Sequence, residues 1–153
     1  MALTVAGAHV AVGPLLSGCY SIVKGINQLH QSYKFIPLTL SSIATTCNMT
    51  SSTLEQVEST LKDYTGAWGN LYQNLLEQFD GIQIGCTMTL SLLETHVSDL
   101  LNIAASDVPS MAQKTARIDK LKALYNESDM KELFGQFKDY NALLNTVLHH
   151  LQR

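Results

Sequence analysis

The stretch IPLTLSSIATTCNMTSSTLEQVESTL, residues 36–61, decides the fold class. Its apolar and small residues recur at steps of three and four, which is the spacing of a helix that buries one seam. The proline near its start is tolerated in a first helical turn, where its missing N–H would have no partner. The sequence therefore predicts a long amphipathic helix with a buried seam of Ile36, Leu40, Ile43, Cys47, Thr50, Leu54, Val57 and Leu61.

A second seam with the same spacing follows over residues 71–100. Gly66 and Gly69 mark a turn between the two segments, so we expect an antiparallel helical hairpin. Gly81 and Gly85 interrupt the second helix on one face, and we expect close approach of a neighbouring backbone, or a bend, at these positions. The seam consists of Leu71, Leu75, Phe79, Ile82, Cys86, Leu90, Leu93, Val97 and Leu100.

The segment before this pair is also helical in pattern. Residues 14–33 present a broad apolar face, and Pro14 is expected to start that helix, because a proline fits the first helical position. Whether residues 3–12 continue the helix through the proline or form a separate element is left open by the pattern.

The last part of the chain contains two further helical patterns. A short helix is expected near residues 118–125, ending at Asn126. Ser128 is the expected cap of a final helix that reaches Leu151. Since no segment shows the alternation of a strand, the sequence predicts an all-α, single-domain antiparallel bundle of about five helices over residues 1–153, with residues 1–12 either included or forming a separate N-terminal segment.

The composition narrows the range of functions. The chain of 153 residues is 46% hydrophobic but only 15% charged, with a formal net charge of −3, whereas soluble domains average about 25% charged residues. Segment 1–54 contains no acidic residue, while segment 55–108 contains eight acids and one base. We therefore expect helix faces of different charge and no binding of nucleic acid.

No motif for nucleotide binding, metal-dependent hydrolysis or a serine nucleophile occurs, so we expect no catalytic residue, no metal ligand and no cofactor. Three cysteines without CxxC spacing fit small buried side chains in a reducing, cytoplasmic environment. The predicted structural core includes Cys19, Cys47, Cys86, Leu90 and Leu93.

Residues 2–23 contain no Lys, Arg, Asp or Glu. Their number approaches the ~20 residues that span a bilayer, but small residues and the Gly13–Pro14 pair favour a helix in or on the core. No base precedes the run, so it does not fit a secretory signal. An alternative is a conditional membrane or interaction segment consisting of Leu3, Val5, Val10, Val12, Leu15 and Leu16.

Four short stretches resemble the fungal N-terminal helical domains of the HeLo-like group, which include N-terminal domains of STAND proteins. They are residues 13–19 (GPLLSGC), 43–47 (IATTC), 85–90 (GCTMTL) and 120–125 (KLKALY). The resemblance implies an effector or adaptor module that precedes nucleotide-binding or ankyrin-type regions. In some relatives it implies a membrane-targeting cell-death effector.

Together, the residues and the resemblance favour a non-enzymatic interaction or signalling module that is cytoplasmic and acts by oligomerisation or by docking a protein partner. Two alternatives stay open. One is recruitment to a membrane through the uncharged N-terminal helix. The other is the binding of a small apolar ligand between helices, for which Gly81 and Gly85 leave space.

Overall fold

The computed structural model describes residues 5–33, 36–63, 70–104 and 125–152, and these form helices without any strand. The predicted all-α class is therefore confirmed. The helices are α1 (Val5–Ser32), α2 (Leu38–Asp63), α3 (Asn70–Ala104) and α5 (Glu127–Leu151). The short helix expected near residues 118–125 falls almost entirely outside the described residues.

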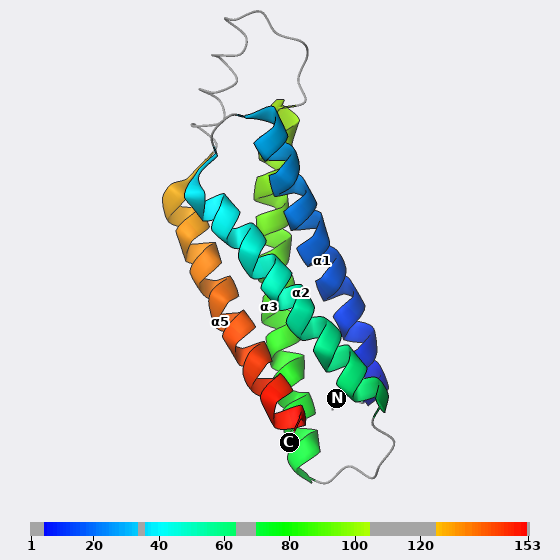
Figure 1. Cartoon of the computed structure of the whole chain (residues 1–153). Helices are drawn as coiled ribbons and strands as arrows, with labels where there is room; N and C mark the ends of the chain where they lie inside the picture. Colours follow the sequence, from blue (N-terminus) through cyan, green and yellow to red (C-terminus); the bar gives the residue numbers. More distant parts are fainter. Residues whose placement is uncertain (1–4, 34–35, 64–69, 105–124, 153) are drawn as a thin grey trace, which may run out of the picture.

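The four helices form an elongated bundle (Figure 1). Helices α1 and α5 lie on opposite sides, and each packs along both α2 and α3. Neighbours α1 and α2 are antiparallel, as are α3 and α5, whereas α1 runs parallel to α3 (Figure 1). The start of α1 and the end of α5 consequently lie at the same end of the bundle.

The expected hairpin of the two central seams is wrong in one respect. Helices α2 and α3 do run in opposite directions, but across their described lengths their backbones do not lie against each other, and each packs along α1 and α5 instead. Both seams face the centre of the bundle, and α1 and α5 fill the spaces between them. Amphipathic spacing identifies the buried side of a helix but not the helix that covers it.

Of the two alternatives left open before Pro14, the structure shows the continuous helix, because α1 begins at Val5 and continues through the proline. A proline inside a helix costs about 3 kcal/mol or more. Gly13 and Pro14 are exposed, whereas Val12 and Leu15 beside them are fully buried. Burying each of those two side chains contributes about 1.5–3 kcal/mol, which offsets the proline, and residues 5–12 therefore belong to the same helix.

The cap of the last helix lies two residues earlier than expected. Asn126, not Ser128, is the N-cap of α5, and its side-chain Oδ1 accepts a hydrogen bond of 3.1 Å from the backbone N–H of Asp129. Asn and Ser are similarly good caps, so the sequence alone did not separate them. With Asn126 as cap, Glu127 and Asp129 both lie in the positive first turn.

Glycines bring α1 close to α3. A Cβ atom built on Gly25 would lie only 2.5 Å from Val97 Cγ1 and 3.3 Å from Leu101 Cδ1. One built on Gly18, two helical turns earlier, would lie 3.4 Å from Leu90 Cδ1. The side chains of α3 therefore occupy the space above these glycines. This close packing holds the two parallel helices together although no short connection joins them.

The close approach of a neighbouring backbone that was one expectation for the glycines of α3 is not found at either position. A Cβ atom on Gly85 would overlap the phenol of Tyr140 from α5, so a side chain fills that space. No atom lies within 4 Å of the corresponding position on Gly81. Gly81 instead opens a hollow on the surface between α3 and α5.

The substitution Gly25→Ala tests the α1–α3 contact. Its methyl group would collide with the stiff, branched side chain of Val97, and overpacking of this kind costs more than the helix-propensity gain of alanine. We expect a net loss of about 1–2 kcal/mol in the free energy of unfolding, measured by urea denaturation. Gly135→Ala is the matched control, because its Cβ meets no atom within 4 Å, and it should gain up to ~1 kcal/mol. Equal stability of the two variants would contradict this packing.

Candidate functional site

The structure places part of the predicted membrane or interaction segment in the core. Val12 and Leu15 are 0% and 1% exposed, and Leu16 is partly buried against the same core. Leu3 lies outside the described residues, and the side chains of Val5 and Val10 are not described either. None of the described helices combines the length and the apolar character that crossing a membrane requires.

The three cysteines meet in the interior. Cys19, Cys47 and Cys86 come from α1, α2 and α3, and all three are free, completely buried thiols. The other two predicted core residues, Leu90 and Leu93, are buried as well. A hydrogen bond from Cys47 lowers the pKa of the Cys19 thiol and, together with burial, raises the pKa of Cys47. Burial raises the pKa of Cys86 to about 12.

Two of these three thiols are held in their neutral form. A thiolate is the reactive and metal-binding form of cysteine, and the interior disfavours it at Cys47 and Cys86. Within the described residues, no group of three or more His, Cys, Asp or Glu side chains is placed to hold a metal ion. The cluster therefore acts as part of the packed core.

Thiol accessibility provides a direct test. We expect that a thiol reagent such as dithionitrobenzoate labels none of the three cysteines in the native protein at pH 8 and labels all three after unfolding in guanidinium chloride. The reason is burial combined with the raised pKa values of Cys47 and Cys86. Rapid labelling of any thiol in the native protein would show that the core opens or that a cysteine is exposed.

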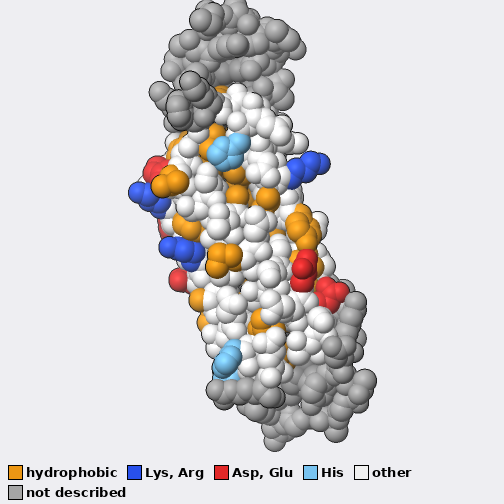
Figure 2. Space-filling model, viewed as in Figure 1, with side chains coloured by type: hydrophobic (Ala, Val, Ile, Leu, Met, Phe, Trp, Pro, Cys, Tyr) orange, Lys and Arg blue, Asp and Glu red, His pale blue; other side chains and the backbone are white. Residues whose placement is uncertain are grey.

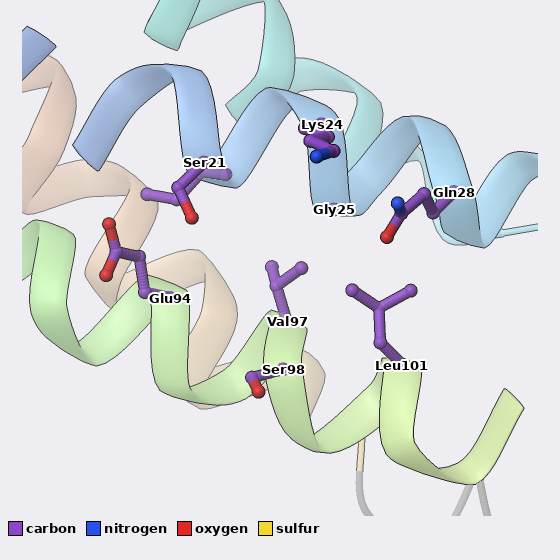
Figure 3. Close-up of a pocket in the computed structure, with 9 residues that line it drawn as sticks. Ser21, Lys24, Gly25, Gln28, Glu94, Val97, Ser98 and Leu101 are labelled. Carbon is purple, nitrogen blue, oxygen red and sulfur yellow. The ribbon is translucent and has the colours of Figure 1, made fainter. Parts of the chain in front are cut away.

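A polar groove of ≈ 270 Å³ follows the α1–α3 contact (Figure 3). Ser21, Lys24 and Gln28 of α1 face Glu94 and Ser98 of α3 across it. The ionisable side chains that line the groove are Lys24 and Glu94. The groove runs past Gly25 and presents these two charged groups together with the hydroxyls of Ser21 and Ser98 and the amide of Gln28.

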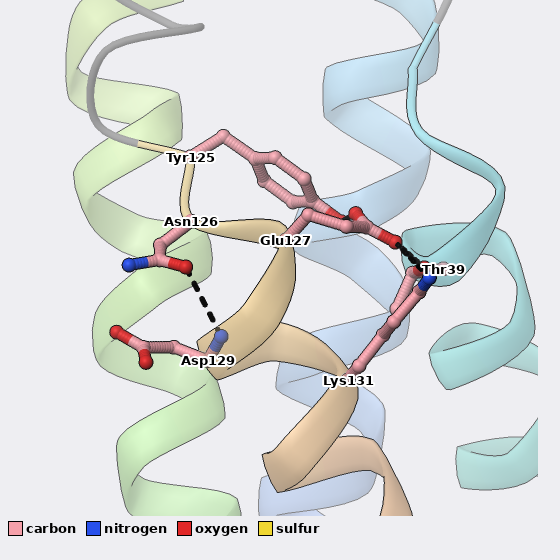
Figure 4. Close-up of polar contacts among 6 residues, drawn as sticks. All are labelled: Thr39, Tyr125, Asn126, Glu127, Asp129 and Lys131. Atoms are coloured by element: carbon pink, nitrogen blue, oxygen red, sulfur yellow. Dashed lines mark hydrogen bonds and ion pairs between the residues drawn. The ribbon is translucent and has the colours of Figure 1, made fainter.

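A second polar cluster joins the starts of α2 and α5 (Figure 4). Thr39 Oγ1 donates a hydrogen bond of 2.5 Å to Glu127 Oε1, and the hydroxyl of Tyr125 donates to Glu127 Oε2. Lys131 Nζ lies 3.8 Å from Glu127 Oε1. These bonds, from Thr39 first and then from Tyr125, lower the pKa of the Glu127 carboxyl. The cluster clasps two helices that are far apart in the sequence.

The clasp predicts a pH dependence. Because the pKa of Glu127 is lower in the folded protein, its contribution to stability is present above the ordinary glutamate pKa and is lost as pH falls through the folded value. Glu127→Gln should lower the thermal midpoint at pH 7, and its difference from the unsubstituted protein should shrink towards pH 3. Scanning calorimetry across this range measures both. A difference that stays constant with pH would mean that the charge of Glu127 is irrelevant.

The most exposed apolar side chains of α3 lie on the side opposite its buried seam. Ile84, Met88 and Leu92 are 55%, 65% and 52% exposed, and their spacing of four residues places them in one row along the helix. Sequence analysis missed this row because the longer buried seam accounted for the helical pattern. The available signal was a second apolar row at the same spacing, offset by two residues from Ile82, Cys86 and Leu90.

The neighbouring helix α5 also has an exposed apolar side chain. Leu143 is 48% exposed and borders a mostly apolar hollow of ≈ 370 Å³ that also involves Gly81 and Tyr140. We call Gly81, Ile84, Met88, Leu92 and Leu143 the α3–α5 face. Exposed apolar side chains that gather on one face of a soluble protein typically mark an interaction site.

The charges around the α3–α5 face are acidic. Glu77 lies seven residues before Ile84 and Asp99 seven after Leu92, so both extend the same row. On α5, Asp139 and Glu132 lie four and eleven residues before Leu143, which places them on the same side of that helix. All four carboxylate side chains are exposed, and α3 contains no Lys or Arg at all.

The bases of α5 lie on another side of the helix. Lys131 reaches Glu127, which bonds Thr39 of α2, and Lys138 Nζ lies 4.7 Å above the ring of Phe134. Figure 2 views the bundle from the α2 side and shows Lys side chains over α5, beside a broad surface with few charges. The two sides of α5 therefore differ in charge, and only the acidic side adjoins the exposed row of α3.

Comparison with known proteins adds no relative: the chain matches no protein-family model, no curated protein and no solved structure.

Proposed function

We propose that this chain is a non-enzymatic, cytoplasmic interaction module that docks a protein partner through the α3–α5 face. It would act in the manner of the N-terminal adaptor domains of fungal signalling proteins that its sequence resembles. The observation that carries the proposal is the row of Ile84, Met88 and Leu92, which is about half exposed on a helix whose other side is fully buried.

Covering the α3–α5 face yields hydrophobic free energy. Fully burying a large apolar side chain contributes about 1.5–3 kcal/mol relative to exposing it. Three such side chains on α3 and Leu143 on α5 are each about half exposed, so a partner that covers them gains several kcal/mol of hydrophobic free energy, before the cost of association. The polar groove beside Gly25 and the clasp at Glu127 offer no comparable gain.

The placement of α1 favours this function over membrane insertion. Val12 and Leu15 contact the core, so presenting them to lipid requires α1 to leave α2 and α3 and to expose the side chains that it covers. A binding site for a small apolar ligand is also less favoured. Tyr140 fills the space at Gly85, and the hollow at Gly81 is bordered by exposed side chains, which suits a shallow docking surface.

The test compares Met88→Asp with Met49→Asp. Both methionines are more than half exposed, on α3 and α2 respectively, so both variants should keep the native circular dichroism and lose no more than about 0.5 kcal/mol of stability. With extracts of the source cells, we expect the unsubstituted protein and Met49→Asp to retain the same partner in affinity capture, and Met88→Asp to lose it. Retention of that partner by Met88→Asp would refute docking at this face.

A further inference from the structure

The partner's chemistry can be inferred from the surroundings of the α3–α5 face. Resting on the proposed function, we propose that this face binds an amphipathic helix of another protein, one whose apolar seam is bordered by Lys or Arg. The inference combines two independent features of the face: the shape of its apolar row and the single sign of its charges.

The shape fits a helix. Ile84, Met88 and Leu92 form a ridge at steps of four residues, and such ridges pack into the grooves on another helix. Beside the ridge, Gly81 leaves the hollow that Tyr140 and Leu143 border on α5. A helix laid along this line contacts the α3 ridge and Leu143 together, which is the helix-in-groove mode of peptide recognition. Extended peptides would need a sheet edge, and the described residues contain no strand.

The charges define the flanks of the partner. Glu77 and Asp99 close the two ends of the α3 row, and Glu132 and Asp139 follow the α5 side. At a rise of ~1.5 Å per residue, Glu77 and Asp99 are about 33 Å apart along the helix. A partner of roughly 22 residues, with bases near both ends of its apolar seam, therefore meets acids at each end.

The same charges disfavour a second copy of this chain. In an antiparallel pairing centred on Met88, Glu77 of one copy would face Asp99 of the other at both ends. In a parallel pairing, each acid would face its own counterpart. Like charges placed opposite each other in an interface cost several kcal/mol, so the face accepts a basic partner better than itself. An anionic membrane surface is disfavoured for the same reason.

The experiment selects the partner helix directly. A display library of 22-residue helices with Leu or Met at three positions spaced by four, and with flanking positions randomised among Lys, Glu, Gln and Ser, is panned against the folded full-length chain. We expect the enriched helices to carry Lys in the flanks. The most enriched peptide is then synthesised, and its affinity is measured by fluorescence anisotropy.

Three variants define the expected result. Met88→Asp should weaken binding about 30-fold or more, as for the centre of an interface. The double variant Glu77→Lys, Asp99→Lys should weaken it about 10-fold and reduce its dependence on salt. Met49→Asp should leave it unchanged. Native circular dichroism in all of them ensures that a loss of binding is not a loss of fold.

Several outcomes would overturn the inference: no enriched helix, enrichment of Glu-flanked or uncharged helices, or a selected peptide whose binding ignores Met88→Asp. Two other occupants of the face, a second copy of the chain and an anionic membrane, are tested in parallel by sedimentation and by binding to phosphatidylserine vesicles. Self-association or vesicle binding that is abolished by Met88→Asp would also overturn the inference. Failure of this inference can be distinguished from failure of the proposed function. If Met88→Asp loses a cellular partner that Met49→Asp retains, docking at this face is still supported, but by a partner of different chemistry.

Discussion

The arrangement of this bundle depends on the close contact between α1 and α3. These two helices are parallel and are separated in the sequence by the whole of α2, so no short connection holds them together. Their side chains must therefore specify the pairing. Val97 over Gly25 does so, because only glycine leaves space for it, and Leu90 packs closely over Gly18 two turns earlier. Once α1 is held there, its opposite flank covers α2, and α5 closes the other side.

The α2–α5 contact is specified differently, by one buried and one partly buried hydrogen bond between side chains. Thr50 Oγ1 donates to Asn141 Oδ1 at 2.9 Å, and Thr53 Oγ1 donates to Asn145 Oδ1 at 3.0 Å. A buried polar group that loses its partner costs about 1–3 kcal/mol. Sliding α5 by one turn along α2 would break both bonds at once, so the pair has one favoured register. Apolar seams without such bonds tolerate more sliding, since hydrophobic contact is not directional.

The sequence predicts which residues are buried better than it predicts their neighbours. Seam positions such as Ile43, Leu54 and Leu93 are buried as expected, because helical periodicity directly reports the side that avoids water. The path through Pro14 was not predictable from local rules, since the burial of Val12 and Leu15 outweighs the helix-breaking tendency of proline. Similarly, Gly81 and Gly85 have the same local pattern, and only the position of Tyr140 distinguishes them.

The exposed row of the α3–α5 face was not predicted, because the helical pattern of α3 was already accounted for by its buried seam. The chemistry of this face follows from the positions of the charges around it. One buried seam is enough to account for a helical pattern, so the sequence alone does not show that Ile84, Met88 and Leu92 on the opposite side of α3 are exposed. The described surface then divides into three parts: few charges over α1 and α2, bases on the α2 side of α5, and acids around the α3–α5 face. An apolar row exposed without charge would attract copies of itself. Acids at its ends oppose that association while leaving the row open to a partner with bases, and repulsion of this kind contributes as much to specificity as attraction does.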